Sequence, residues 1–307
     1  MRVARALTSA SVLAVDLGGT NLRAGLLPAG ADFADVEHLA TVPAPSDLDG
    51  FRGTLQVLLR EAAERAPVDR LGLAVPGTAD IDRCLWVPKL PYLNGLSLED
   101  LVEVPATVAN DAQLALLAEV TAGSAAGRRD VVLFAVGTGI GSAVMTGGRI
   151  VVGAHGAACS AGWLSLDPDE PGHPTDGWLE RHAAGPAFDA AAQRLAWLDG
   201  SDASSLMEAA AAGDPKAREA VAGPARMLGA AIAATVAVLD PECVLFAGGV
   251  AASFPALEPH LRDVLRRHAP AHLQGIELQV GRFGPRAGLV GAAVAGDRGR
   301  SWMEVQP

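Results

Sequence analysis

Two glycine-rich segments of this chain have the residue types that bind phosphate groups. They are Gly18-Gly19-Thr20-Asn21 and Gly137-Thr138-Gly139-Ile140-Gly141, and each lies between two apolar runs. The apolar runs alternate as strands do, so each segment is expected to form the turn of a β-hairpin. The backbone N–H groups and Thr hydroxyl of such a turn can bind an anion. Two copies suggest a clamp that holds a polyphosphate from both sides.

Other readings of these glycines fit the sequence less well. A Rossmann fingerprint needs a helix after its glycines, and a P-loop ends in Gly-Lys-Ser/Thr. Here a strand-like pattern follows both segments, and neither contains lysine. Two ordinary hairpins remain the alternative.

Composition narrows the class of protein. The chain has 307 residues, half of them hydrophobic, and a formal net charge of −11. This length predicts two domains, and the acidic charge argues against nucleic acid as the main partner. The widely spaced Cys84, Cys159 and Cys243 indicate a reducing compartment. The weakly apolar N-terminus runs into the first strand, and the apolar stretch 227–239 is too short to span a bilayer. We therefore expect a ragged N-terminal end, a buried helix at 227–239 and a soluble, cytoplasmic protein that does not engage a membrane.

The remaining pattern alternates strands and helices, which favours an α/β fold with mixed sheets. The segments 81–96 and 153–175 are expected to be irregular. Strands are predicted at 12–17, 22–27, 71–75, 106–109, 131–136, 142–145, 243–246 and 276–280, and helices at 48–66, 112–120, over most of 177–239, at 250–268 and at 287–295.

These motifs resemble the ROK family of sugar kinases and repressors, within the actin-like ATPase superfamily. Besides the two glycine segments, the resemblance rests on Val75-Pro76-Gly77, Val108-Ala109-Asn110-Asp111 and Ala247-Gly248-Gly249-Val250. It implies two actin-like (ribonuclease H-like) domains with an ATP cleft between them. We expect a small domain over 1–112, completed by the C-terminal helix at about 287–307, and a larger one over 113–286. ROK repressors carry a helix-turn-helix domain before the first motif, and too few residues precede it here.

The resemblance also assigns roles to residues. The two glycine segments would hold the phosphates of ATP, and Gly248 and Gly249 would contact its adenosine. Asp16, at a strand end beside the first turn, would hold Mg²⁺ through water. Asp111 would accept the proton of the attacking hydroxyl, while Asn110 and Gly77 would bind the sugar. Without the resemblance, Asn-Asp before a helix reads as an N-cap.

The chain departs from the family pattern around the sugar. Ser160 and Trp163 stand where ROK kinases carry a sugar-binding Glu and a His, whereas Glu180 is retained. Trp163 is either an apolar platform for the ring or a space filler. Lys89, where many relatives carry a sugar-facing Asn, points either at the cleft or at solvent. The Cys positions of the family's zinc motif hold Pro171, His173 and Trp178. A structural zinc site needs four ligands, so we predict none.

The sequence therefore predicts an ATP- and Mg²⁺-dependent kinase of a sugar or sugar-like polyol, which forms a homodimer. Two alternatives remain: a kinase of a C7-cyclitol or specialised-metabolite sugar, and a catalytically weak sugar-binding regulatory protein. Glucose is expected to be a poor substrate, because two of its usual partners are missing.

Overall fold

The protein is described by a computed structural model that covers residues 7–195 and 202–305. The N-terminal end that we expected to be ragged lies mostly outside these residues. The chain divides into two compact units. Unit 1 comprises Met1–Arg129, Ala143–Ala158 and Gly281–Pro307, and unit 2 comprises Asp130–Ser142 and Cys159–Val280.

The sheet of unit 1 has the order β3-β2-β1-β4-β7. Strands β1 and β2 form the predicted antiparallel hairpin, and β4 and β7 continue the sheet in parallel. Strand β3 was not predicted, because its residues are mostly exposed and their apolar pattern is weak. The bounds are β1 (Val12–Leu17), β2 (Asn21–Leu27), β3 (Glu37–Pro43), β4 (Arg70–Val75) and β7 (Ala106–Asn110).

A second five-stranded sheet repeats this arrangement. Its order is β10-β9-β8-β11-β12, in which a first strand again lies between its hairpin partner and two parallel strands. The repeat seen in the sequence is thus a repeat of topology, and it confirms the predicted α/β class. The bounds are β8 (Val131–Val136), β9 (Ile140–Thr146), β10 (Arg149–Ile150), β11 (Cys243–Ala247) and β12 (Glu277–Val280).

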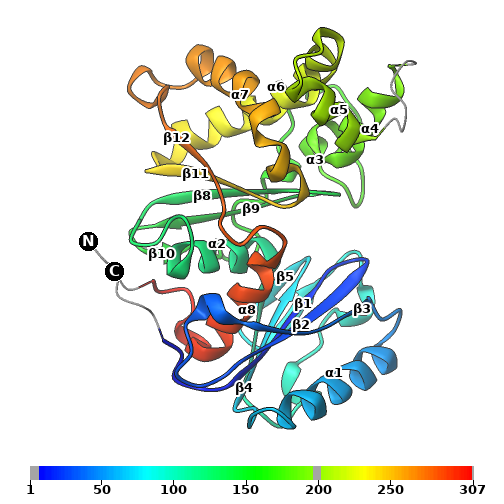
Figure 1. The fold of residues 1–307 in the computed structure, drawn as a ribbon, viewed down its shortest axis with the longest axis vertical. Coiled ribbons are helices and arrows are strands. Elements are labelled where there is room, and N and C mark those ends of the chain that lie inside the picture. The colour runs from blue at the N-terminus through cyan, green and yellow to red at the C-terminus, as the bar shows by residue number, and fades with distance from the viewer. Residues whose placement is uncertain (1–6, 196–201, 306–307) are drawn as a thin grey trace. The chain divides into compact units, whose positions relative to one another are not determined.

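In the described part of the chain, unit 1 has the α-helices α1 (Leu48–Ala63), α2 (Asp111–Ala122) and α8 (Ala287–Arg298). Helix α8 packs on β1 and β4 and lies beside α2 (Figure 1). Glycines make this packing close, because a β-carbon on Gly72 would overlap the Ala292 carbonyl, and one on Gly291 would overlap that of Leu114. Since α2 packs on α8, it groups with unit 1, whereas we had placed its residues after 112 in the second domain.

A buried carboxylate fixes α2 to the chain that enters α8. Glu119 is fully buried, and its oxygens accept hydrogen bonds from the backbone N–H groups of Arg282 and Phe283, both at 2.9 Å. Ser124 donates to the same carboxylate through its N–H at 2.9 Å and its hydroxyl at 3.0 Å. These bonds compensate the cost of burying the charge.

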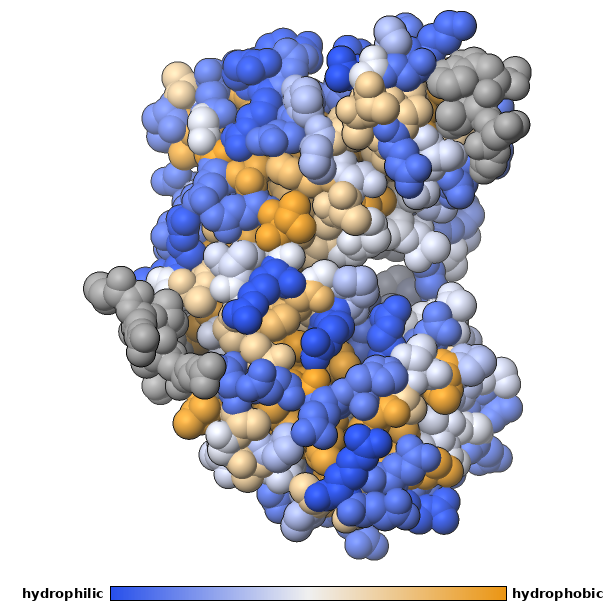
Figure 2. Space-filling view, in the orientation of Figure 1, coloured by the Kyte–Doolittle hydropathy of each residue, from blue (hydrophilic) through white to orange (hydrophobic). Residues whose placement is uncertain are grey.

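In the described part of unit 2, the helices pack largely on one another. They are α3 (Trp178–Ala183), α4 (Gly185–Gln193), α5 (Ala203–Ala211), α6 (Pro215–Leu239) and α7 (Phe254–His268). Helix α6 is longer than the stretch 227–239 that we expected to be buried. By length and composition it could cross a membrane, but half of its most apolar window is buried, and it packs on α3, α4, α5 and α7. Buried packing of this kind is that of a core helix. In the space-filling view, hydrophilic residues are spread among smaller hydrophobic groups on the face shown (Figure 2).

The segment expected to be irregular contains a short hairpin. Strands β5 (Thr78–Asp80) and β6 (Arg83–Trp86) pair antiparallel, and an irregularity shifts their register between Thr78 and Ala79. Their short length and irregular register gave no alternation long enough to predict. The hairpin begins directly after Gly77 and ends at Trp86. It therefore connects Gly77 to the segment that carries Lys89, both of which the resemblance relates to the sugar.

Candidate active site

The first glycine turn leaves two backbone donors available. The N–H of Gly18 donates to the Asn21 carbonyl at 2.9 Å and closes the hairpin, so this group is not the bare donor that we expected. Among the described residues, the N–H groups of Gly19 and Thr20 have no protein acceptor. Adjacent free N–H groups in a turn are suited to an anion such as a phosphate.

Asp16 lies at the end of β1, next to this turn. Its carboxylate pairs with the guanidinium of Arg23 at 3.4 Å, and the two residues are opposite one another in the β1–β2 register. Burial raises the pKa of Asp16 above its usual value, and Arg23 counteracts this rise. A β-carbon on Gly288 would lie 3.0 Å from Oδ1 of Asp16, so only glycine lets α8 approach this carboxylate without a shift. The position fits a partly desolvated carboxylate that works with cations.

Asn110 caps α2 and also holds the Gly77 loop. Its Oδ1 accepts hydrogen bonds from the N–H groups of Ala112 at 3.0 Å and Gln113 at 3.1 Å, and its Nδ2 donates to the Gly77 carbonyl at 3.0 Å. The capping role weighed from the sequence thus belongs to Asn110. One N–H of its amide remains for a ligand, and Asp111 is not needed as the cap of α2.

Asp111 is the first residue of α2, and its Oδ1 accepts a hydrogen bond from the Ala112 N–H at 2.8 Å. Burial raises the pKa of its carboxyl to about 7, and the charge of Asp16 adds to the rise. The Ala112 N–H and the charge of Lys89 act in the opposite direction. A carboxyl with a pKa near neutrality is well matched to accept a proton from a hydroxyl at physiological pH.

Lys89 lies against the first glycine turn. A β-carbon on Gly19 would lie 3.5 Å from Cδ and 3.8 Å from Cβ of Lys89. The segment before it packs on Gly77, where a β-carbon would overlap the Trp86 carbonyl. Contacts therefore join Gly19 to Lys89, the segment before Lys89 to Gly77, and Gly77 to Asn110, which directly precedes Asp111.

The second glycine turn is braced by two residues from helices of unit 2. The Gly137 N–H donates to the Gly139 carbonyl at 2.9 Å, and the Gly137 carbonyl accepts the N–H of Gly185 at 2.7 Å. Oε2 of Glu180 accepts the N–H of Ile140 at 2.8 Å. Among the described residues, the N–H groups of Thr138 and Gly139 have no acceptor, whereas Gly141 already lies inside β9.

The segment assigned to adenosine borders the second turn. Gly248 has a φ of 81°, and a β-carbon there would lie 2.5 Å from the Val136 carbonyl oxygen. Gly249 follows it, and its backbone N would lie 3.9 Å from a β-carbon on Gly137. Only glycine fits both the backbone conformation and the close contact at position 248, so a side chain here would disturb the second turn as well.

The loop after β9 has a polar network where the family's zinc motif would be. The carboxylate of Glu170 accepts hydrogen bonds from Trp178 Nε1 at 2.7 Å and from Arg181 at 2.5 Å, and it lies 3.1 Å from His182 Nε2. The rings of Trp178 and His182 stack at 4.0 Å. These contacts fix the loop to α3, the helix that carries Glu180. Within the described ranges, no group of three or more His, Cys, Asp or Glu could hold a metal ion.

Ser160 and Trp163 lie next to each other at a short 3₁₀ helix, Ala161–Trp163. Trp163 is 47% exposed, so much of its indole remains accessible to a ligand. The imidazole of His173 pairs with Asp176, with Nδ1 and Oδ2 2.9 Å apart.

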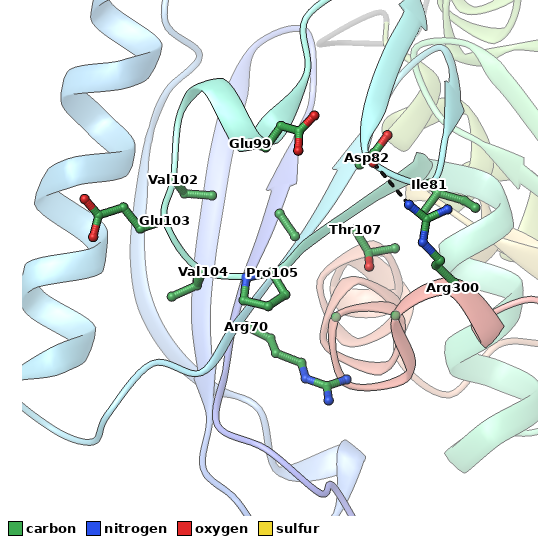
Figure 3. Close-up of a pocket in the computed structure, with 13 residues that line it drawn as sticks. Arg70, Ile81, Asp82, Glu99, Val102, Glu103, Val104, Pro105, Thr107 and Arg300 are labelled. Carbon is green, nitrogen blue, oxygen red and sulfur yellow. Dashed lines mark ion pairs between the residues drawn. The ribbon is translucent and has the colours of Figure 1, made fainter.

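A cavity of about 370 Å³ in unit 1 lies away from these residues (Figure 3). It is bordered by Arg70 and Ala106, which begin β4 and β7, whereas Asn110 ends β7. Its rim carries an ion pair between Arg300 and Asp82 at 3.7 Å. Ligands of parallel sheets bind at the carboxyl ends of the strands, so the site chemistry belongs to the Asp111 end.

Several residues that shape the site carry no signal in the sequence. Arg23, Gly288, Glu170 and the placement of Lys89 against Gly19 depend on which strands and loops become neighbours. No motif marked them, although the cross-strand position of Arg23 follows once the β1–β2 register is known.

Comparison with known proteins identifies relatives. A family model described as the ROK family matches residues 12–296. An N-acetylmannosamine kinase of Shigella flexneri is 32% identical over 298 residues, which cover 92% of this chain and 97% of that protein. The chain spans about half the length, 54%, of a bifunctional enzyme NanE/NanK of Brucella melitensis, with 31% identity over 93% of this chain. A ROK family glucokinase from Streptomyces griseus, solved with glucose and AMPPNP, superposes with a TM-score of 0.79 and 27% identity, covering 94% of this chain and all of that one.

Proposed function

The chain belongs to the ROK family, and we propose that it is an ATP-dependent sugar kinase. This enzyme transfers the γ-phosphoryl group of ATP to a hydroxyl of a sugar. The observation that carries the proposal is Asp111, a partly buried carboxyl whose pKa is raised to about 7 by burial and by the charge of Asp16, the residue beside the first glycine turn. A pure sugar-binding regulator would need neither feature.

Asp111 acts as the general base. Its free carboxylate oxygen accepts the proton of the attacking hydroxyl while the hydroxyl oxygen forms a bond to the γ-phosphorus. The bond from that phosphorus to the β,γ-bridging oxygen breaks, and ADP leaves with the electron pair. Positioning and charge neutralisation supply most of the catalysis in such transfers, and a positioned base contributes on the order of 10²–10⁴-fold.

The glycine turns bind the phosphates of ATP. Free N–H groups at Gly19 and Thr20 and at Thr138 and Gly139 offer donors to phosphate oxygens. AMPPNP in the Streptomyces griseus relative supports ATP as the donor. Gly248 and Gly249 leave room for the adenosine, because neither adds a side chain beside the second turn.

Asp16 fits a role in holding Mg²⁺. It is an oxygen donor of the type that Mg²⁺ prefers, and its charge raises the pKa of Asp111, so a cation held by Asp16 would reduce the repulsion between the two carboxylates. When bound with ATP, Mg²⁺ would neutralise phosphate charge. Asp16 would hold it through water, and Arg23 keeps Asp16 oriented.

The acceptor class is an N-acetylhexosamine or another sugar with an apolar substituent. Ser160 and Trp163 replace two strong polar partners of glucose, and the exposed indole of Trp163 can cover an acetyl methyl group. The name of the Shigella flexneri relative supports this class. Asn110, Gly77 and Glu180 remain the proposed polar contacts, and a C7-cyclitol is the alternative acceptor.

Other features of the protein remain proposals. We propose the two-domain division with a C-terminal helix returning to the first domain, a homodimer formed through the exposed side of α6, and a cytoplasmic location without nucleic acid or membrane partners. We also propose that no zinc binds, because the Glu170 network already fixes the loop to α3.

A phosphorylation screen with ATP and Mg²⁺ tests the function. Hexoses, N-acetylhexosamines and cyclitols are offered to the purified chain, and ADP release is measured with each. We expect the largest kcat/KM for an N-acetylhexosamine. Absence of acceptor-dependent ADP release across all three classes would overturn the proposal.

A further inference from the structure

Lys89 is held in place by a short, well-anchored turn of unit 1. The Leu90 N–H donates to the Val87 carbonyl at 3.0 Å, and the Val87 N–H donates to Oδ1 of Asn94 at 2.7 Å. Val87 and Leu90 are buried, whereas Lys89 between them is exposed. The backbone position of Lys89 is therefore fixed, and its side chain extends along Gly19.

The ammonium group of Lys89 lacks a partner in the described part of the chain. No hydrogen bond or ion pair joins it to residues 7–195 or 202–305. The chain contains only one other lysine, Lys216, which lies in unit 2. An unpaired cation that lies against a phosphate-type turn has a natural partner in an anionic ligand.

We propose that the ammonium group of Lys89 contacts the phosphoryl group while it moves from ATP to the acceptor hydroxyl. This inference rests on the proposed kinase function and assigns Lys89 to the transferred group instead of to the sugar. Lys89 supplies no atom to the products. The hydroxyl proton still goes to Asp111, and the electron pair of the broken phosphorus–oxygen bond still leaves with ADP.

The location of Lys89 favours contact with the transferred phosphoryl group over contact with another anionic group of the substrates. Gly19 belongs to the turn with free N–H donors, and Asp111 marks where the acceptor hydroxyl must lie. The Lys89 charge is close enough to Asp111 to act on its carboxyl electrostatically. The phosphoryl group moves from the phosphate site toward the hydroxyl held by the base. A fixed cation along this path can stabilise the charge on the phosphoryl oxygens.

The same charge also helps the base. It favours the ionised form of Asp111 and so opposes the effect of burial. Removing the charge should therefore have two effects: slower transfer at every pH, and a shift of the acidic limb of the pH profile to higher pH.

The test compares three variants with the wild type. Lys89→Met removes the charge and keeps the length, Lys89→Arg restores a charge, and Lys216→Met is the matched control in unit 2. With ATP, Mg²⁺ and the best acceptor, Lys89→Met should lower kcat by on the order of 10²-fold with a small change in the acceptor KM. Lys89→Arg should recover part of the loss, and Lys216→Met should behave as the wild type.

A binding measurement separates this role from a structural one. ADP with aluminium fluoride mimics the phosphoryl group in transfer, so Lys89→Met should bind it more weakly in the presence of acceptor, while its affinity for ADP alone stays unchanged. Wild-type kcat in Lys89→Met, or a loss confined to the acceptor KM, would overturn the inference. The latter result would assign Lys89 to an anionic group on the acceptor. If the wild type phosphorylates no acceptor at all, the proposed function itself fails; if the wild type is active and only Asp111→Asn is slow, only this inference fails.

Discussion

Oε2 of Glu180 accepts a hydrogen bond from the backbone N–H of Ile140 at 2.8 Å. The carboxylate lies so close to Gly139 that any side chain there would overlap it. A residue expected from the sequence to bind a sugar hydroxyl therefore also shapes the turn expected to bind phosphate. Glu170 fixes the preceding loop to the helix that carries Glu180, through Trp178 and Arg181.

Glu180→Ala should weaken ATP binding as well as acceptor binding. A hydrogen bond to a charged group contributes about 1.5–3 kcal/mol, so the KM for ATP is expected to rise by roughly 10–100-fold. Steady-state kinetics with each substrate varied in turn measure this. The exposed Glu208→Ala is the control, and an unchanged KM for ATP in Glu180→Ala would show that the contact does not shape the phosphate turn.

Asp111→Asn should slow transfer without abolishing nucleotide binding. The cap of α2 is made by Asn110, so the helix should form normally. Loss of the base is expected to reduce kcat by on the order of 10²–10⁴-fold, with ATP affinity near that of the wild type in a direct titration. Asp49→Asn, at an exposed site of α1, serves as control. Near-normal turnover in Asp111→Asn would remove it from the mechanism.

The raised pKa of Asp111 predicts how activity depends on pH. The base must be ionised, so kcat/KM should fall as the pH is lowered through about 7. A profile measured from pH 5 to pH 9 checks this. A kcat/KM that stays constant down to pH 5 would mean that the pKa of the carboxyl is not raised in the free enzyme.

The same pKa predicts how stability depends on pH. The unfolded carboxyl ionises above its ordinary pKa of 3.8, whereas the folded one stays protonated up to about 7. The contribution of this carboxyl to stability therefore falls as the pH rises from about 4 to 7, and Asp111→Asn should be more stable than the wild type at pH 8 by up to about 4 kcal/mol. Urea unfolding at pH 4 and pH 8 should show a difference only at the higher pH. Equal differences at both would contradict it.

Glu119→Ala should destabilise unit 1. The change leaves the N–H groups of Arg282, Phe283 and Ser124 without their acceptor. Each part-buried donor left without its acceptor costs about 1 kcal/mol, the low end of the range for unpaired polar groups. The free energy of unfolding should therefore fall by about 3 kcal/mol. Urea unfolding gives the value, with the exposed Glu61→Ala as control, and a loss as small as the control's would show that water replaces the carboxylate.

Glucose should be a poor acceptor. With Ser160 and Trp163 in place of a carboxylate and an imidazole, two hydrogen bonds are lost at about 1–3 kcal/mol each, which lowers kcat/KM by roughly a hundredfold or more. Competition between glucose and N-acetylmannosamine measures the preference. Comparable efficiency on the two sugars would mean that other residues compensate for both replacements.

The sequence by itself determined the α/β class, the repeated hairpins and the family. Alternation and glycine turns are local, so β1–β2 and β8–β9 could be predicted from residues next to each other along the chain. The site motifs were predictable for the same reason, because each is a turn directly after a strand. Weakly patterned elements escaped: β3 is mostly exposed, and β5 and β6 are too short to show a period.

Only the tertiary structure decided how these residues act on one another. Asp16 pairs with Arg23, and burial together with Asp16 raises the pKa of Asp111. Lys89 contacts Gly19, and the Ile140 N–H donates a hydrogen bond to Glu180. The sequence pattern alone does not show that these residues interact. Electrostatic and packing energies depend on distance and on exclusion of water, and both are set by which strands and helices become neighbours. A sequence motif identifies the chemical groups of a site, whereas tertiary packing determines their ionisation and which atoms they contact.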